Sequence, residues 1–150
     1  MQNGPIIIEK AGFSDLLVLQ KLEKACFDKD AWPLFDLAGV LTLPRIIRLK
    51  AIVSCKMAGF IAGDADNQNI GWVSTIGVFP EYRRMGVGAA LLKAFEADVS
   101  TPEIRLTVRQ SNQPAIKMYE ELGYSSIETW EAYYKDGEDG LVMRKLRAIT

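Results

Sequence analysis

The sequence predicts an α/β domain with a mixed sheet, that is, one containing both antiparallel and parallel strand pairs. Three strand-like runs in the first half of the chain follow one another with short polar breaks, as in an antiparallel meander. A strand, a turn, a helix and another strand then follow in that order, which is typical of a parallel crossover unit. Since 150 residues with 49% hydrophobic content can fill one substantial core, we expect a single domain over residues 1–150.

The first elements are predicted to be a strand and two helices. Residues 6–10 form a short β-branched run, and the polar pair Ser14-Asp15 then precedes apolar residues at helical spacing. A second helix over residues 34–43 stops before Pro44, because the residue that precedes a proline is pushed out of the helical region.

The meander is expected from residues 49–55, 57–63 and 70–79. Residues 86–98 then have the apolar periodicity of a helix, and a β-branched strand follows at residues 104–108. The third strand of the meander, the helix and this last strand make up the crossover unit.

The C-terminal part is predicted to contain a helix and a hairpin. Asn112 or Ser111 caps the helix at its start, and Gly123 ends it in the left-handed conformation typical of a C-cap. Residues 126–134 and 141–146 are predicted to be the two strands of the hairpin.

The composition excludes several classes of function. The chain has no histidine, so Ser-His-Asp catalysis, Cys-His catalysis and histidine-ligated zinc are excluded within it, and we expect no metal site. A net charge of −1 with charges spread along the chain gives no general attraction to nucleic acid or to an anionic membrane. No apolar run is long enough to span a membrane and no secretory pattern opens the chain, so we expect a cytoplasmic protein.

Cys26 and Cys55 are the two cysteines of the chain. They lie among apolar residues and lack the Cys-x-x-Cys spacing of redox and metal motifs. We therefore expect buried, reduced thiols rather than a disulfide or a catalytic pair.

A predicted strand and a predicted helix are joined by the segment Arg83-Arg84-Met85-Gly86-Val87-Gly88. Small residues at such a turn let backbone N–H groups face an anion, and the helix N-terminus adds roughly half a positive charge. The arginines can add charge-assisted hydrogen bonds, so a diphosphate-bearing cofactor is the expected guest. The alternative is a tight turn with solvated arginines. A dinucleotide fingerprint would need a third glycine where Leu91 stands, and no Walker motif is present.

This segment resembles the signature of the GNAT superfamily of N-acetyltransferases, (Gln/Arg)-x-x-Gly-x-(Gly/Ala). A second block of that family has the pattern Asn-x-x-Ala-x-x-x-Tyr-x-x-x-Gly-(Phe/Tyr). It is matched at the same spacing by Asn112, Ala115, Tyr119, Gly123 and Tyr124. The resemblance extends over about residues 5–147, and it is greatest to the RimI-type and Nα-acetyltransferase branch.

The resemblance implies the GNAT fold, with helices on both faces of a mixed sheet and two parallel strands, residues 74–79 and 104–109, that splay apart to hold acetyl-CoA. It implies that main-chain groups of the first strand pair with the pantetheine arm and that the amides of residues 84–89 hold the diphosphate. Asn112 would contact the cofactor near the thioester, or serve as a helix cap alone. The implied cofactor-binding residues are Ile76, Gly77, Val78, Arg83, Arg84, Met85, Gly86, Val87, Gly88, Ala89, Asn112 and Tyr119.

The resemblance places Tyr119 at the family's general acid, which protonates the departing thiolate. The alternative for Tyr119 is a core aromatic. The base is open, because the positions where relatives carry a Glu, His or Tyr fall on Thr107 and Trp72, which do not take a proton at neutral pH. A water wire to main-chain carbonyls is favoured. Glu131, whose alternative role is a solvated charge, is the carboxylate to test first.

Two further segments bear on the acceptor. Tyr133 and Tyr134 resemble the tyrosine hairpin with which Nα-acetyltransferases hold a substrate peptide, and tyrosine hydroxyls can hydrogen-bond peptide groups. Phe27 and Trp32 lie in the loop that lines the pocket for the first substrate residue in this branch. Either pair could instead pack on the core.

We therefore expect an N-acetyltransferase that transfers acetyl directly from acetyl-CoA to the N-terminal α-amino group of a protein or peptide, without a covalent acyl-enzyme. The alternatives are an acetyltransferase for a small amine, such as a polyamine, an amino acid or an antibiotic, and a non-catalytic acyl-CoA sensor. No nucleic-acid or membrane partner is expected. Both a monomer and a homodimer stay open.

Overall fold

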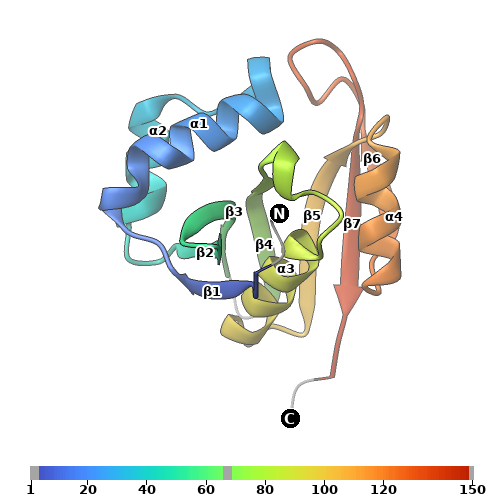
Figure 1. Ribbon diagram of the computed structural model, residues 1–150. Helices are drawn as coiled ribbons and strands as arrows, with labels where there is room; N and C mark the ends of the chain where they lie inside the picture. The colour runs from blue at the N-terminus through green and yellow to red at the C-terminus, as the bar shows by residue number, and fades with distance from the viewer. Residues whose placement is uncertain (1–3, 66–68, 149–150) are drawn as a thin grey trace. The chain divides into compact units, whose positions relative to one another are not determined.

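The computed structural model describes residues 4–65 and 69–148 (Figure 1). The chain divides into two compact units. The first unit comprises the chain up to Asp64 together with Ser74–Asp98. The second comprises Ala65–Val73 together with the chain from Val99 on. The division falls within one strand, β4, which spans Ile70–Val78.

Besides its part of β4, the first unit contains the strands β1 (Ile7–Lys10), β2 (Ile47–Val53) and β3 (Lys56–Asp64). Its α-helices are α1 (Leu16–Phe27), α2 (Leu34–Thr42) and α3 (Val87–Asp98), and its 3-10 turns are η1 (Phe13–Asp15), η2 (Asp28–Asp30) and η3 (Pro80–Tyr82). The second unit contains β5 (Glu103–Arg109), α4 (Gln113–Glu121), β6 (Ser125–Trp130) and β7 (Gly140–Leu146).

The described strands are hydrogen-bonded in the order β1-β2-β3-β4-β5-β7-β6. The pairs β1–β2, β2–β3, β5–β7 and β6–β7 are antiparallel. β4 and β5 are parallel, and their ladder joins Ile70, Gly71 and Trp72 to Glu103, Ile104 and Arg105. The predicted mixed sheet and the crossover from strand through helix to parallel strand are thus confirmed.

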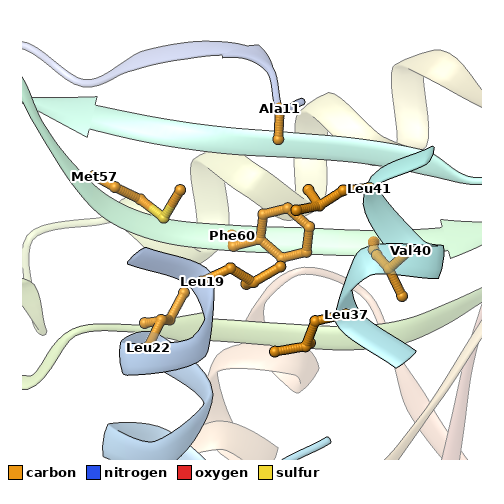
Figure 2. Close-up of a cluster of buried hydrophobic side chains, with 9 residues drawn as sticks. Ala11, Leu19, Leu22, Leu37, Val40, Leu41, Met57 and Phe60 are labelled. Atoms are coloured by element: carbon orange, nitrogen blue, oxygen red, sulfur yellow. The ribbon is translucent and has the colours of Figure 1, made fainter. Parts of the chain in front are cut away.

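Helices cover both faces of the first unit's strands, as expected. Successive residues of a strand point to opposite faces, and in β3 this separates Phe60 from Gly59. Figure 2 shows the Phe60 ring facing apolar side chains of α1 and α2, among them Leu19 and Leu37. On the other face, a Cβ added at Gly59 would meet Leu91 of α3 at 3.0 Å. Burying each large side chain contributes about 1.5–3 kcal/mol.

Gly59 also fixes how closely β3 approaches β4 at the start of α3. A Cβ at this position would lie 2.8 Å from the main-chain oxygen of Gly77 and 3.1 Å from Val87, the first residue of α3. Any larger residue would force these atoms apart. The glycine therefore lets β3 lie close both to Gly77 of β4 and to the first residue of α3.

In the second unit, β5 separates an apolar face from a polar one. Ile104, Leu106 and Val108 are buried, whereas Arg105 and Thr107 on the opposite face are half-buried. One face of β5 therefore lies in the core, and the other face is partly exposed and carries polar side chains.

The helix α4 begins and ends as the sequence predicts. Asn112 is its N-cap, and its side-chain oxygen accepts a hydrogen bond from the amide of Ala115 at 3.3 Å. Gly123 follows the helix with a φ of 100°, a conformation that favours glycine.

Two predictions are wrong. The strand expected over residues 126–134 ends at Trp130, because Ala132 is left-handed with a φ of 49° and its amide donates to the carboxylate of Asp139. Cys55 is exposed rather than buried, because it stands in the two-residue turn between β2 and β3 with a φ of 68°. Both cysteines are free thiols, as expected, and Cys26 is half-buried.

Within residues 4–65 and 69–148, no helix has the length and apolar character needed to cross a membrane.

Candidate active site

The turn that precedes α3 has an unusual backbone. Arg84 and Gly86 both have positive φ angles, of 64° and 83°, and α3 begins at the next residue, Val87. A Cβ added at Gly86 would have no atom within 4 Å, so the space beside this glycine is open. The first amides of a helix have no acceptor within the helix and carry a partial positive charge. The turn can therefore accommodate an anion such as a diphosphate.

The two arginines of this turn have different surroundings. Arg83 turns back onto β4, where its Nε donates to the main-chain oxygen of Val78 at 3.2 Å. Its Nη2 lies 3.8 Å from the Sγ of Cys26, which itself donates to the same oxygen at 3.3 Å. Burial raises the pKa of the Cys26 thiol, although Arg83 opposes this in part. Both arginines are exposed, and the Arg84 backbone is left-handed.

The two aromatic residues expected to line an acceptor pocket lie in different places. Phe27, at the end of α1, approaches β4 closely enough that a Cβ at Gly77 would be 3.5 Å from its ring. Trp32 is half-buried and packs against the hydrophobic core of the first unit. Phe27 thus lies beside one of the residues implied in cofactor binding, whereas Trp32 makes the core contact that was its alternative and keeps part of its side chain exposed.

One ionisable residue that the sequence interpretation missed is Glu23, on the buried face of α1. Glu23 is only 2% exposed. One carboxylate oxygen accepts from the amide of Trp32 at 3.2 Å, and the other accepts from the hydroxyl of Thr75 at 3.0 Å. Burial raises the pKa of Glu23, and these two hydrogen bonds oppose the shift. The available signal was its position: Glu23 shares the apolar helical stripe of Leu22 and Cys26.

In the second unit, Tyr119 is 5% exposed and belongs to α4. Its ring meets that of Tyr124 edge to face, with 6.1 Å between centroids. Burial, together with the neighbouring Tyr134, raises the pKa of the Tyr119 hydroxyl above its ordinary value. The hydroxyl therefore stays protonated near neutral pH and can act as a proton donor.

Four aromatic side chains form a continuous series, which we call the aromatic row: Trp72, Trp130, Tyr133 and Tyr134. Their successive ring centroids are 5.9, 5.2 and 5.0 Å apart. Cations lie over both ends, with Arg105 5.9 Å from the Trp72 ring and Arg109 4.3 Å from the Tyr134 ring. The sequence predicts that the two tyrosines bind the acceptor, but it does not show that two tryptophan rings continue the series of contacts beyond Tyr133.

Charged residues hold the loop that carries these tyrosines, residues 131–139, to the end of β5. Arg109 donates to Asp136 at 3.0 Å and to Glu138 at 2.7 Å. Glu138 also accepts from the amide of Ser111 at 2.7 Å. Hydrogen bonds from Ser111 and Arg109 lower the pKa of Glu138. The loop is therefore tied to the start of α4.

The residues considered for the base lie on or near the same loop and strand. Glu131 is exposed immediately after β6. Thr107 lies in the middle of β5, where a Cβ at Gly140 would be 2.9 Å from its methyl group and 3.0 Å from the Tyr133 ring. The side chains of Thr107 and Tyr133 thus both lie against Gly140. Among the residues that the structure describes, no cluster of acidic or cysteine side chains could hold a metal ion.

Known proteins resemble this chain in both sequence and fold. Residues 22–124 match the model described as the acetyltransferase (GNAT) family. An uncharacterized N-acetyltransferase of Methanocaldococcus jannaschii is 31% identical over 144 residues, which are 93% of this chain and 91% of that protein. The chain therefore belongs to the GNAT acetyltransferase family.

Two further relatives are more specific in name. An N-alpha-acetyltransferase of Sulfurisphaera tokodaii is 43% identical over 77 residues, which are 49% of this chain and 46% of that protein. The ribosomal-protein-S18-alanine N-acetyltransferase of Escherichia coli has a TM-score of 0.87 at 26% identity, over 97% of this chain and 96% of that one. The chain spans about half the length of the first of the curated relatives that it matches. The predicted family and GNAT fold are confirmed.

Proposed function

We propose that this protein transfers the acetyl group of acetyl-CoA to the N-terminal α-amino group of a protein or peptide. Acetyl-CoA is the donor that acetyltransferases of this family use. The observation that carries the proposal is the open, left-handed turn at Arg84 and Gly86 directly before α3, in a chain of this family. The choice of acceptor is supported by the relatives named N-alpha-acetyltransferase and ribosomal-protein-S18-alanine N-acetyltransferase and by the tyrosines of the aromatic row.

The first unit supplies the proposed cofactor-binding groups. The amides of residues 84–89 hold the diphosphate, and Arg84 adds a charge-assisted hydrogen bond from its exposed position. Arg83 fixes the turn onto β4 through Val78. Main-chain groups of residues 76–78 pair with the pantetheine arm as a neighbouring strand does. Asn112 belongs to the second unit, where it caps α4, and we propose that it also contacts the cofactor near the thioester.

When bound, acetyl-CoA supplies an acetyl group activated as a thioester. Tyr119 donates the proton that the departing sulfur takes up, a role that suits a hydroxyl whose pKa is raised. The acceptor amine loses its proton to water that is in contact with main-chain carbonyls, since Thr107 has no basic group. Glu131 is the carboxylate whose replacement tests this assignment first.

The acceptor is held by aromatic side chains in this proposal. The hydroxyls of Tyr133 and Tyr134 hydrogen-bond the main chain of the peptide, while their rings provide apolar contact. Phe27 and Trp32 border the pocket for its first residue. A preformed loop suits this role, because a grip that is already ordered loses less entropy on binding, and Arg109 and Glu138 order the loop here.

The test is an assay of the purified protein with acetyl-CoA, a panel of peptides with different first residues, and a panel of small amines. Release of free CoA thiol measures turnover, and mass spectrometry locates the acetyl group. The proposal expects turnover with peptides and acetylation at the α-amino group. Turnover with polyamines, amino acids or antibiotics alone would make the protein a small-amine acetyltransferase. Binding of acetyl-CoA without turnover of any amine would make it a sensor.

A single domain, a cytoplasmic location, and a monomeric or homodimeric state stay predictions of the sequence. Each has a direct measurement: cooperative unfolding observed by two probes, fractionation of cells, and the mass of the protein in solution.

A further inference from the structure

Glu23 is a buried acidic side chain that the proposed mechanism does not use. A carboxylate removed from water is unfavourable unless hydrogen bonds satisfy it, and both of its oxygens accept one. The donors come from separate elements. One is the main-chain amide of Trp32, and the other is the hydroxyl of Thr75 in β4.

Each donor lies next to a segment proposed to bind substrate. Trp32 stands between η2 and Pro33, the N-cap residue of α2, and so belongs to the connection proposed to border the acceptor pocket. Thr75 immediately precedes the main-chain groups of residues 76–78 proposed for the pantetheine arm. All of these residues belong to the first unit. The Glu23 carboxylate is therefore a direct link between the acceptor loop, residues 28–33, and β4.

A carboxylate suits this link because it can accept two hydrogen bonds from different directions at once. An apolar side chain of similar size would fill the space but would leave the Trp32 amide and the Thr75 hydroxyl without this acceptor, which is unfavourable for buried polar groups. A glutamine could keep both contacts. Its oxygen would accept from Trp32, and its NH₂ group would donate to the Thr75 oxygen.

We infer that Glu23 is a positioning residue, which holds the acceptor loop at a fixed distance from β4 and thereby sets the affinity for the acceptor. The inference rests on the proposed function. Because the link lies outside the reacting groups, its loss affects acceptor binding in the ground state and the transition state alike. Such a change raises KM and leaves kcat nearly unchanged.

The test compares the variants Glu23→Ala, Glu23→Gln and Thr75→Val with the wild type, each as the full-length chain. Leu19→Ala is the matched control, since Leu19 is fully buried on the same helix but takes no part in the link. For each variant we measure KM and kcat for the best peptide, the Kd for acetyl-CoA, the Tm, and the exchange of backbone amides in residues 28–33 by mass spectrometry.

The inference expects Glu23→Ala to raise the peptide KM about tenfold, with kcat and the acetyl-CoA Kd within about threefold of wild type. Glu23→Gln stays within about threefold of wild type in KM, and Leu19→Ala lowers the Tm without raising KM. Glu23→Ala also accelerates amide exchange in residues 28–33. If Glu23→Ala does not fold, Thr75→Val decides the question through the same increase in KM and in exchange.

A wild-type KM in both Glu23→Ala and Thr75→Val would overturn the inference. So would a Glu23→Gln variant as impaired as Glu23→Ala, because the charge rather than the link would then matter. The failure of the proposed function is distinct, since the wild-type protein itself would then acetylate no peptide. If the wild type is inactive, amide exchange still tests the link: unchanged exchange in Glu23→Ala would show that Glu23 does not hold residues 28–33.

Discussion

The Nε of Arg83 donates a hydrogen bond to the main-chain oxygen of Val78 at 3.2 Å. The two neighbouring arginines of this motif are both exposed, but they differ in backbone conformation, since Arg84 is left-handed with a φ of 64°. Arg83 ties the turn before α3 to the end of β4, and Arg84 is the residue proposed to attract an anion. The proposed roles of the turn lead to the first prediction.

Reversing the charge of both arginines, by Arg83→Glu and Arg84→Glu together, should weaken acetyl-CoA binding by about tenfold or more, since charge-assisted hydrogen bonds to the diphosphate are replaced by repulsion. Isothermal calorimetry measures the Kd. The control is Lys21→Glu with Lys93→Glu, which changes the net charge equally at two exposed positions outside the turn. Wild-type affinity in the double arginine variant would contradict the assignment of the diphosphate to this turn.

Replacing Tyr119 by phenylalanine should lower kcat by about 10²-fold or more and leave the acetyl-CoA Kd nearly unchanged, as expected for the loss of one general acid. Because the pKa of Tyr119 is raised, its ionisation should not reduce kcat at any pH below about 10, the ordinary value for tyrosine. Steady-state kinetics across pH measures both effects. Tyr124→Phe, which keeps the neighbouring ring, is the control. An unchanged kcat in Tyr119→Phe would remove this residue from the mechanism.

Glu23→Gln should stabilise the protein near neutral pH. The pKa of Glu23 is raised in the folded state, whereas an unfolded glutamate titrates near 4.3. Between about pH 4.3 and the raised folded pKa, the native state keeps a proton that the unfolded chain releases. The resulting stability is present below about pH 4.3 and is lost as the pH rises through the folded pKa. The nearby Cys26 thiol and the Arg83 guanidinium beside it belong to the same environment.

Urea unfolding of wild type and Glu23→Gln at pH 4 and pH 7 measures this difference. The variant should be the more stable protein at pH 7, and the advantage should shrink at pH 4. Glu81→Gln, at an exposed site of the first unit, controls for the loss of one negative charge. A variant that is less stable at pH 7, or a gain that does not depend on pH, would contradict the prediction.

The two cysteines should react with thiol reagents at different rates. Cys55 is exposed in the turn between β2 and β3, whereas Cys26 is half-buried, donates to Val78 and has a raised pKa. Since the thiolate is the reactive form, a disulfide reagent should modify Cys55 at least about tenfold faster than Cys26. Mass spectrometry of the native protein follows both sites, with Cys55→Ser and Cys26→Ser to assign them. Equal rates would show that Cys26 is more accessible than the structure indicates.

Local patterns in the sequence predict most of the fold. Apolar spacing and the positions of proline and glycine depend on neighbouring residues, so they identify α1 to α4 and the strands between them. The N-cap Asn112 and the left-handed Gly123 are examples. The motif at residues 83–88 is local in the same sense.

What the sequence did not predict depends on contacts between distant residues. Glu23 and Thr75 are 52 positions apart, and the stacked pair Trp72 and Trp130 comes from different strands. The apolar periodicity of a helix does not predict which strand its buried face will contact. The prediction that β6 continues to Tyr134 was wrong for a related reason. The carboxylate of Asp139, seven residues further along the chain, accepts a hydrogen bond from the amide of Ala132.

The most direct test of the account is a titration of ¹⁵N-labelled protein with coenzyme A, followed by NMR. If the turn before α3 holds the diphosphate, the main-chain amides of Gly86, Gly88 and Ala89 should show the largest changes in chemical shift. If these amides stay unchanged while signals elsewhere move on binding, coenzyme A binds at another site and the proposed mechanism is wrong.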